Sequence, residues 1–160
     1  MSTKIKVNLG QGFRLKQNGA FDLDKIFKKM KEWSKKNKYE FHEKDHVDKL
    51  LQNGHEIILK WVLTKETTDY MQYETTIEFL LKGMYKIENG LSVGNLQITF
   101  KSNLILDYEN KWQHTEFLKF LNSIYNKYII KPKIKKHMLK LSGEIENLKD
   151  LTKKELEMYR

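Results

Sequence analysis

Apolar and polar residues alternate along the middle of this chain. The odd-numbered positions from 73 to 81 are mostly apolar, whereas the even-numbered positions from 72 to 78 carry glutamine, glutamate and threonine. The same period of two runs through residues 55–64 and 96–106. This pattern predicts the strands of an antiparallel sheet that has one solvated face.

Turn signals separate these predicted strands. Asn53-Gly54 and Asn89-Gly90 predict tight hairpins, because a type I′ turn needs positive φ at both of its central residues. The polar run at residues 67–69 favours another turn. We therefore expect residues 39–108 to form an antiparallel meander.

Apolar residues recur every three or four positions on both sides of the meander. Residues 22–37 predict a helix that Asp22 caps and that Asn37 ends in a left-handed conformation. A second helix is predicted over residues 115–130, and Pro132 ends or kinks it before a further helical stretch. The buried stripe of the second helix is expected to consist of Phe117, Phe120, Leu121, Ile124 and Tyr128, with Tyr125 as a further candidate.

The two ends of the chain add further elements. Alternation near the N-terminus is interrupted at Gly10 and Gly12 and resumes at Phe13, which predicts a strand with a bulge or bend. Asn18-Gly19 predicts a turn. At the other end, residues 152–155 match a capping box and predict a short last helix.

This order of elements predicts an α+β fold. We expect an antiparallel meander of about five strands, with one helix after the first strand and a long C-terminal helix on the same face. Residues 1–142 are predicted to form a single domain, and residues 143–160 an amphipathic helical extension.

Composition limits the chemistry of this protein. The 160 residues include no cysteine, which excludes disulfides, a thiol nucleophile and cysteine-ligated metals. No apolar run reaches the length of about 18 residues that a membrane span needs, and the first residues do not resemble a signal peptide. These features predict a cytoplasmic protein.

Positive charge is concentrated in the predicted helices. The net charge is +9; residues 25–38 carry seven lysines and one acid, and residues 111–142 carry eight lysines and one acid. Lysine attracts polyanions but is poorly suited to recognising base sequence, and the alternative is that these lysines only solvate the outer sides of the helices. The residues predicted to contact a polyanion are Lys28, Lys29, Lys35, Lys36, Lys131, Lys133, Lys135 and Lys136.

Catalytic and metal-binding patterns are not recognised in the sequence. The serines stand in no nucleophile motif, and there is no phosphate-binding glycine loop. His42 and His46 are four residues apart, which on a strand separates them by about 13 Å, too far for one ion. We therefore predict no catalytic residues, no metal, no cofactor and no enzymatic activity.

Aromatic residues from the strands and helices have two interpretations. They pack as an ordinary core, or some of them line a cavity for an apolar ligand between the sheet and the long helix. The residues predicted to line such a pocket are Trp61, Phe79, Phe100, Phe117 and Phe120.

Two resemblances accompany these patterns. A helix after the first strand and a long helix closing over a meander resemble the helix-grip arrangement of START-like lipid-binding proteins, although those have two helices between their first two strands. This resemblance implies a cavity for an apolar ligand. The segment D-Y-E-N-K-W at 107–112, with F-L-K-F-L and Y-N-K-Y-I-I after it, resembles small uncharacterised archaeal proteins and implies no named activity.

The sequence therefore leaves three functional hypotheses. The first is a non-enzymatic binding module whose lysines engage nucleic acid, the ribosome or an anionic membrane surface. The second is a small carrier of an apolar ligand. The third is a homo-oligomer in which acidic strands meet basic helices, since residues 40–80 carry nine acids and four lysines.

Overall fold

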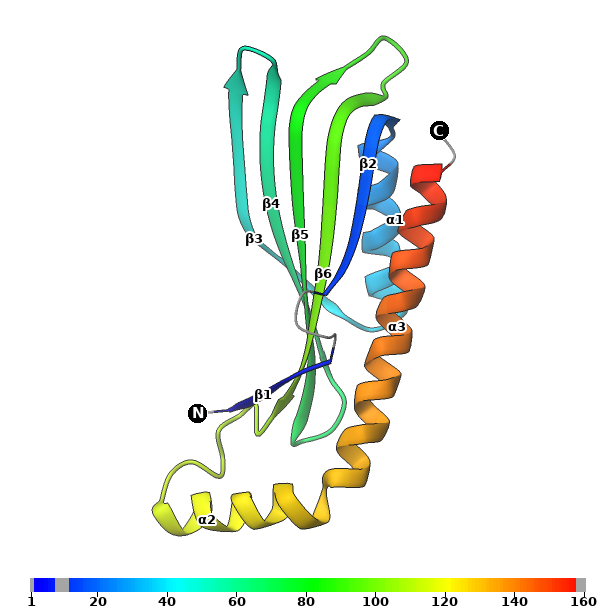
Figure 1. The fold of residues 1–160 in the computed structure, drawn as a ribbon. Coiled ribbons are helices and arrows are strands. Elements are labelled where there is room, and N and C mark those ends of the chain that lie inside the picture. The colour runs from blue at the N-terminus through cyan, green and yellow to red at the C-terminus, as the bar shows by residue number, and fades with distance from the viewer. Residues whose placement is uncertain (1, 8–11, 158–160) are drawn as a thin grey trace.

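The computed structural model describes residues 2–7 and 12–157 and shows an α+β fold (Figure 1). Six antiparallel strands form one sheet in the order β1-β6-β5-β4-β3, and β2 also pairs with β6. The meander consists of β3 (Glu40–Leu51), β4 (Gly54–Glu66), β5 (Met71–Lys86) and β6 (Ser92–Leu106). The predicted fold class and the predicted turns between these strands are confirmed.

The N-terminal segment forms two strands where one bent strand was predicted. β1 (Thr3–Lys6) and β2 (Phe13–Phe21) pair in succession with β6. Gly12 has a φ of +73°, and Gly10 lies outside the described residues. The turn predicted at Asn18-Gly19 is wrong, because both residues pair with β6 and the sheet ladder outweighs their local turn preference.

The first helix, α1 (Leu23–Lys36), follows β2 directly. The Asp22 carboxylate accepts a hydrogen bond from the Lys25 N–H at 3.0 Å, which confirms the predicted N-cap. Asn37 does not adopt the predicted left-handed conformation, since its φ is −90°. Lys38, one residue later, has a φ of 62° and turns the chain toward β3.

The C-terminal helices change direction at residue 130. α2 (Glu116–Ile124) continues into a π-helical turn, η1 (Tyr125–Ile129), and α3 (Lys131–Glu157) then runs along the sheet (Figure 1). Pro132 occupies the first turn of α3, where its missing N–H leaves no helical hydrogen bond unmade. The predicted break before this proline is confirmed.

Residues beyond 142 belong to the folded unit and are not an extension. The boundary predicted at residue 142 falls inside α3, and the segment beyond it supplies the buried Ile145, Leu148 and Leu156 to the core. The short last helix predicted from the capping box is also wrong. The Thr152 hydroxyl donates to the Leu148 carbonyl within α3, so it caps no new helix.

The core lies between one face of the sheet and the two helices α1 and α3. The Phe27 ring of α1 lies 4.8 Å from the Trp61 ring of β4 and 5.1 Å from the Phe79 ring of β5, measured between centroids. α3 packs beside α1 over β6 and β2. Because both helices use the same face, their outward sides form one helical layer.

Candidate functional site

Polar contacts join α1 to the C-terminal half of α3. The Trp33 indole donates to Asn147 Oδ1 over 2.9 Å. At the other end of α1, Lys25 Nζ lies 3.2 Å from Glu155 Oε2, and Lys29 donates to Glu155 Oε1. The Glu155 side chain is 5% exposed, so these contacts bury a charge cluster between the helices.

The charge state of Glu155 follows from its surroundings. Burial by itself raises the pKa of this carboxyl group, but the hydrogen bonds and charges of Lys29 and Lys25 outweigh it and lower the pKa below its ordinary value. The ionised carboxylate therefore neutralises part of the positive charge of α1.

Most of the eight predicted polyanion-binding lysines remain exposed and uncompensated. Among residues 2–7 and 12–157, Lys29 is the single member of this set that forms an ion pair. The seven others are exposed: Lys28, Lys35, Lys36, Lys131, Lys133, Lys135 and Lys136.

The structure does not bring these lysines into one cluster. α1 contacts α3 at Asn147 and Glu155, whereas the α3 lysines occupy residues 131–136. From residue 136 to residue 147 the helix rises by about 16 Å. The predicted lysines therefore form two groups within the helical layer, one on each helix.

Lys140, which was not among the predicted residues, extends the α3 group toward α1. Lys133, Lys136 and Lys140 precede Asn147 at successive spacings of three, four and seven residues, which places them on the helix face that meets α1. Lys36 lies beside Asn147 on the α1 side. We call Lys36, Lys133, Lys136 and Lys140 the lysine line. The heptad spacing between Lys133, Lys140 and Asn147 was the available sequence signal.

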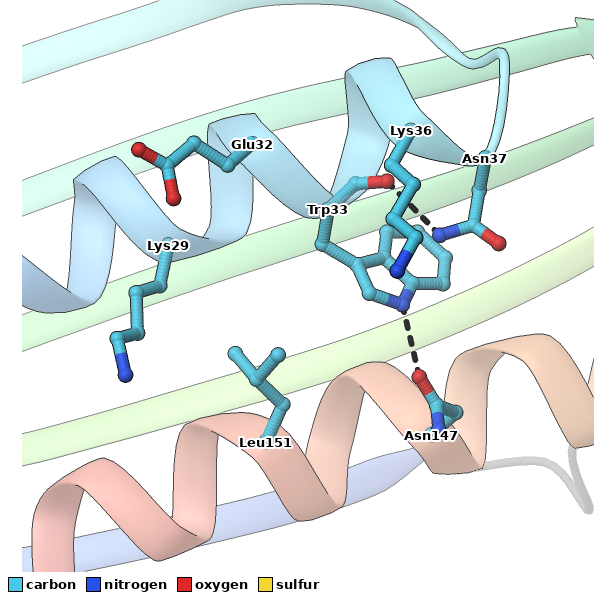
Figure 2. Close-up of a pocket in the computed structure, with 7 residues that line it drawn as sticks. All are labelled: Lys29, Glu32, Trp33, Lys36, Asn37, Asn147 and Leu151. Carbon is cyan, nitrogen blue, oxygen red and sulfur yellow. Dashed lines mark hydrogen bonds between the residues drawn. The ribbon is translucent and has the colours of Figure 1, made fainter.

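Lys36, the α1 member of the lysine line, borders a hollow of about 400 Å³ between α1 and α3 (Figure 2). Figure 2 shows Lys29 and Lys36 at its two ends and the Trp33 indole reaching across to Asn147. Glu32 adds a negative charge to the same wall. The lining of the hollow therefore carries both positive and negative side chains. Of its two lysines, Lys29 is paired with Glu155 and Lys36 is exposed.

The five residues predicted to line an apolar pocket are divided between the core and α2, although the Trp61 and Phe79 rings lie 4.6 Å apart within the core. Trp61, Phe79 and Phe100 are buried in the core, at 2%, 1% and 0% exposure. Phe117 and Phe120 lie on α2 and are 68% and 62% exposed. The prediction placed α2 over the sheet, whereas the chain turns at residue 130 and carries α2 away from it.

A different apolar hollow lies between α1 and the strands β3, β4 and β5. Its volume is about 480 Å³, within the range of small-molecule sites. Its apolar lining consists of Leu23, Phe27, Ile57, Leu59 and Met84. At its rim, His55 Nδ1 and Asp48 Oδ1 form a hydrogen bond of 2.8 Å.

The three histidines of β3 and β4 bind separate carboxylates. His46 Nδ1 lies 3.3 Å from Glu43 Oε1, and His42 Nε2 lies 3.7 Å from Glu40 Oε2. His55 pairs with Asp48. In the part of the chain that the structure describes, no group of three or more acidic or histidine side chains has the arrangement of a metal site.

The apolar stripe of α2 faces solvent, although burial was predicted for it. Phe117, Phe120, Ile124 and Tyr128 are 68%, 62%, 38% and 68% exposed. Their spacing of three and four residues aligns them along one side of α2 and η1. We call these four residues the apolar ridge.

The opposite, polar side attaches α2 to the rest of the protein. The Tyr70 hydroxyl, at the start of β5, contacts Asn122 Oδ1 and Asn126 Oδ1. The Tyr125 ring meets the Tyr70 ring edge-on at 5.5 Å and stacks on Trp112 at 5.9 Å. A surface helix normally buries its apolar side and exposes its polar side, so the orientation of α2 is reversed.

The loop before α2 is held by Asp107. Its buried carboxylate accepts hydrogen bonds from the Trp112 N–H and the Gln113 amide, both at 3.2 Å to Oδ2. The N-cap of α2 is Thr115, whose hydroxyl accepts from the Leu118 N–H at 3.1 Å. Asp107 and Trp112 therefore position α2 rather than form a separate site.

His137 lies where the lysine line passes the core. The Tyr73 hydroxyl and His137 Nδ1 are 2.7 Å apart. Burial, followed by the charges of Lys140 and Lys136, lowers the pKa of His137 below its ordinary value. A hydrogen bond therefore joins His137 to Tyr73, and the charges of Lys140 and Lys136 disfavour protonation of the imidazole.

Comparisons with known proteins identify no relative of this chain. No family model, no curated protein and no solved structure matches the chain. The resemblances to helix-grip and archaeal proteins therefore stay predictions. Across residues 2–7 and 12–157, none of the helices has the length and apolar character required to cross a lipid bilayer.

Proposed function

We propose that this protein is a non-enzymatic binding module that docks onto a polyanionic partner through the lysines of its helical layer. One observation carries the proposal: seven of the eight predicted lysines are exposed and form no ion pair with any described carboxylate. Lys140 joins them on α3. Uncompensated lysines within one helical layer attract phosphate-rich surfaces.

The mode of contact follows from the chemistry of lysine. Each ammonium group is a hydrated point charge that contacts phosphates without recognising a base edge. Lys29 has a different role, because Glu155 holds it at the junction between the helices. Docking therefore depends on the lysine line and its neighbours rather than on the Glu155 cluster.

Neutralising the lysine line tests this proposal. The triple variant Lys133→Gln, Lys136→Gln, Lys140→Gln is expected to weaken binding to phosphatidylserine vesicles or duplex RNA by at least about tenfold, since each such lysine contributes on the order of 1 kcal/mol. Glutamine keeps the helix propensity of lysine, so α3 should remain folded. Flotation and fluorescence anisotropy measure the two affinities.

A matched control carries the same change of charge on the sheet. Lys16, Lys44 and Lys82 are exposed residues of β2, β3 and β5, and their replacement by glutamine should leave the affinity nearly unchanged. Equal losses in the two triple variants would show that net charge, and not the helical layer, determines binding. That result would contradict the proposed docking surface.

A second candidate function is supported by the apolar hollow beneath α1. Its apolar lining and the His55–Asp48 pair at its rim suit a ligand with an apolar body and one polar end. This site differs from the predicted pocket, because α1 and not α3 covers it. Its volume of about 480 Å³ limits it to a small ligand.

Decanoate is a suitable probe of this hollow. Its binding is expected to shift the NMR methyl signals of Leu59 and Met84, which line the hollow, and to leave the core methyls of Leu148 in place. The absence of selective shifts at millimolar decanoate would reject the hollow as a site for apolar chains.

A further inference from the structure

The apolar ridge exposes large apolar side chains to solvent along one side of α2 and η1. Three of its members, Phe117, Phe120 and Tyr128, are aromatic and more than 60% exposed. The helix is nevertheless well attached, since Tyr70 binds Asn122 and Asn126 on its other side. An exposed apolar stripe on a helix whose other side is attached by hydrogen bonds and by the packed Tyr125 ring marks a surface that binds something apolar.

The apolar ridge calls for an apolar partner, and the charge around it shows that this partner must also be negatively charged. Residues 117–142, which include the ridge and the start of α3, contain seven lysines and no acid. The nearest acid in sequence, Glu116, is paired with Lys119 at 2.8 Å. The partner must therefore offer an apolar layer and a high density of negative charge side by side.

We infer that the apolar ridge binds the surface of an anionic lipid bilayer, with α2 lying in the plane of the headgroups. The inference rests on the proposed function and names its polyanionic partner. The ridge side chains enter the boundary between headgroups and acyl chains, while the surrounding lysines contact anionic headgroups. An anionic bilayer supplies a negatively charged headgroup layer for the lysines and, directly beneath it, an apolar acyl layer for the ridge side chains.

The position of α2 allows this contact. Figure 1 shows α2 at the end of the molecule opposite the C-terminus, crosswise to α3 and apart from the faces of the sheet. Lys131, Lys133, Lys135 and Lys136 follow directly at the corner between η1 and α3. A flat surface can therefore meet the ridge and these lysines without moving the core.

Two other occupants fit the same surface less well. A second copy of this chain, paired ridge to ridge, would bring like-charged lysines together around the contact. A nucleic acid would satisfy the lysines but would leave Ile124 and the aromatic ridge residues without an apolar layer, unless single-stranded bases stacked on them. Both are outcomes that the experiment below distinguishes.

Removing the ridge tests the inference on the full chain. The double variant Phe117→Gln, Phe120→Gln is expected to bind phosphatidylserine vesicles at least about tenfold more weakly than wild type in flotation. Its control is Leu50→Gln, Leu51→Gln on the β3–β4 hairpin, which also removes two exposed apolar side chains and should bind like wild type. Circular dichroism checks that both variants are folded.

Direct insertion is measured with a reporter on the ridge. Phe120→Trp is expected to show a blue-shifted emission on phosphatidylserine vesicles and quenching by brominated acyl chains. Vesicles of phosphatidylcholine alone should give little of either signal, because the lysines then lack anionic headgroups.

The outcomes separate the inference from the proposed function. Wild-type binding to duplex RNA but not to vesicles would overturn the bilayer inference and leave polyanion binding standing. Failure to bind either probe would overturn both. Unchanged vesicle affinity of the ridge variant would also overturn the bilayer inference. So would light scattering that shows a wild-type dimer, no vesicle binding, and dissociation of that dimer in the ridge variant. This last result would identify a second copy of the chain as the partner of the ridge.

Discussion

Replacing Leu148 by alanine is expected to lower the free energy of unfolding by about 2–5 kcal/mol. Leu148 is fully buried, at 0% exposure, and lies in the part of α3 that joins the core between α1 and the sheet. The substitution leaves a cavity that the surrounding strands cannot fill. Urea unfolding followed by circular dichroism measures the loss.

Leu139→Ala provides the matched control for this prediction. The two leucines occupy the same helix, but Leu139 is 67% exposed, so its loss should change the free energy of unfolding by less than about 0.5 kcal/mol. Equal effects at the two positions would contradict the packing of α3. A negligible effect at Leu148 would restore the view that residues beyond 142 are an appended helix.

Stability is expected to fall steeply above about pH 10 because of two tyrosines. Burial, with the hydrogen bond and charge of Glu144, raises the pKa of Tyr39, and burial followed by the charge of Glu144 raises the pKa of Tyr73 to about 12. Both phenols therefore hold their protons longer in the folded state than in the unfolded state. Their stabilising effect is complete below the unfolded pKa of about 10 and is lost as pH rises toward the folded values.

The expected slope is about 1.4 kcal/mol of unfolding free energy per pH unit for each tyrosine in this range. Urea midpoints between about pH 9 and about pH 12 measure it. Tyr39→Phe should make the slope shallower while Lys65 still binds Glu144 at 3.0 Å. An unchanged slope in this variant would contradict the raised pKa of Tyr39.

The elements with strong local patterns were predictable from the sequence. Period-two strands, the Asn53-Gly54 turn and the Asp22 cap depend on neighbouring residues, and the structure has each of them. Asn18-Gly19 shows the limit of this logic, since pairing with β6 overrides a local turn signal. The capping box near Thr152 failed for the same reason, because burial of Glu155 against α1 keeps α3 continuous.

The candidate site was predictable only in part. Exposure of lysines on α1 and α3 follows from their helical spacing, but the capture of Lys29 by Glu155 depends on contacts between distant segments. The ridge residues were recognised as a stripe and wrongly assigned to the core. An amphipathic pattern predicts that one side of a helix differs from the other, whereas the direction in which it faces is set by the turn at residue 130 and by Tyr70.

The salt dependence of binding is the measurement that tests the docking surface most directly. If the lysines of the helical layer contact phosphates, affinity for phosphatidylserine vesicles or duplex RNA must fall linearly with salt on logarithmic axes. Contacts from the four residues of the lysine line predict a slope of about −4 on duplex nucleic acid. On vesicles, where the apolar ridge and the lysines at the start of α3 make the contact, affinity must also decline as salt is raised. Binding that is absent at about 50 mM salt, or that does not change as salt is raised, would contradict the account.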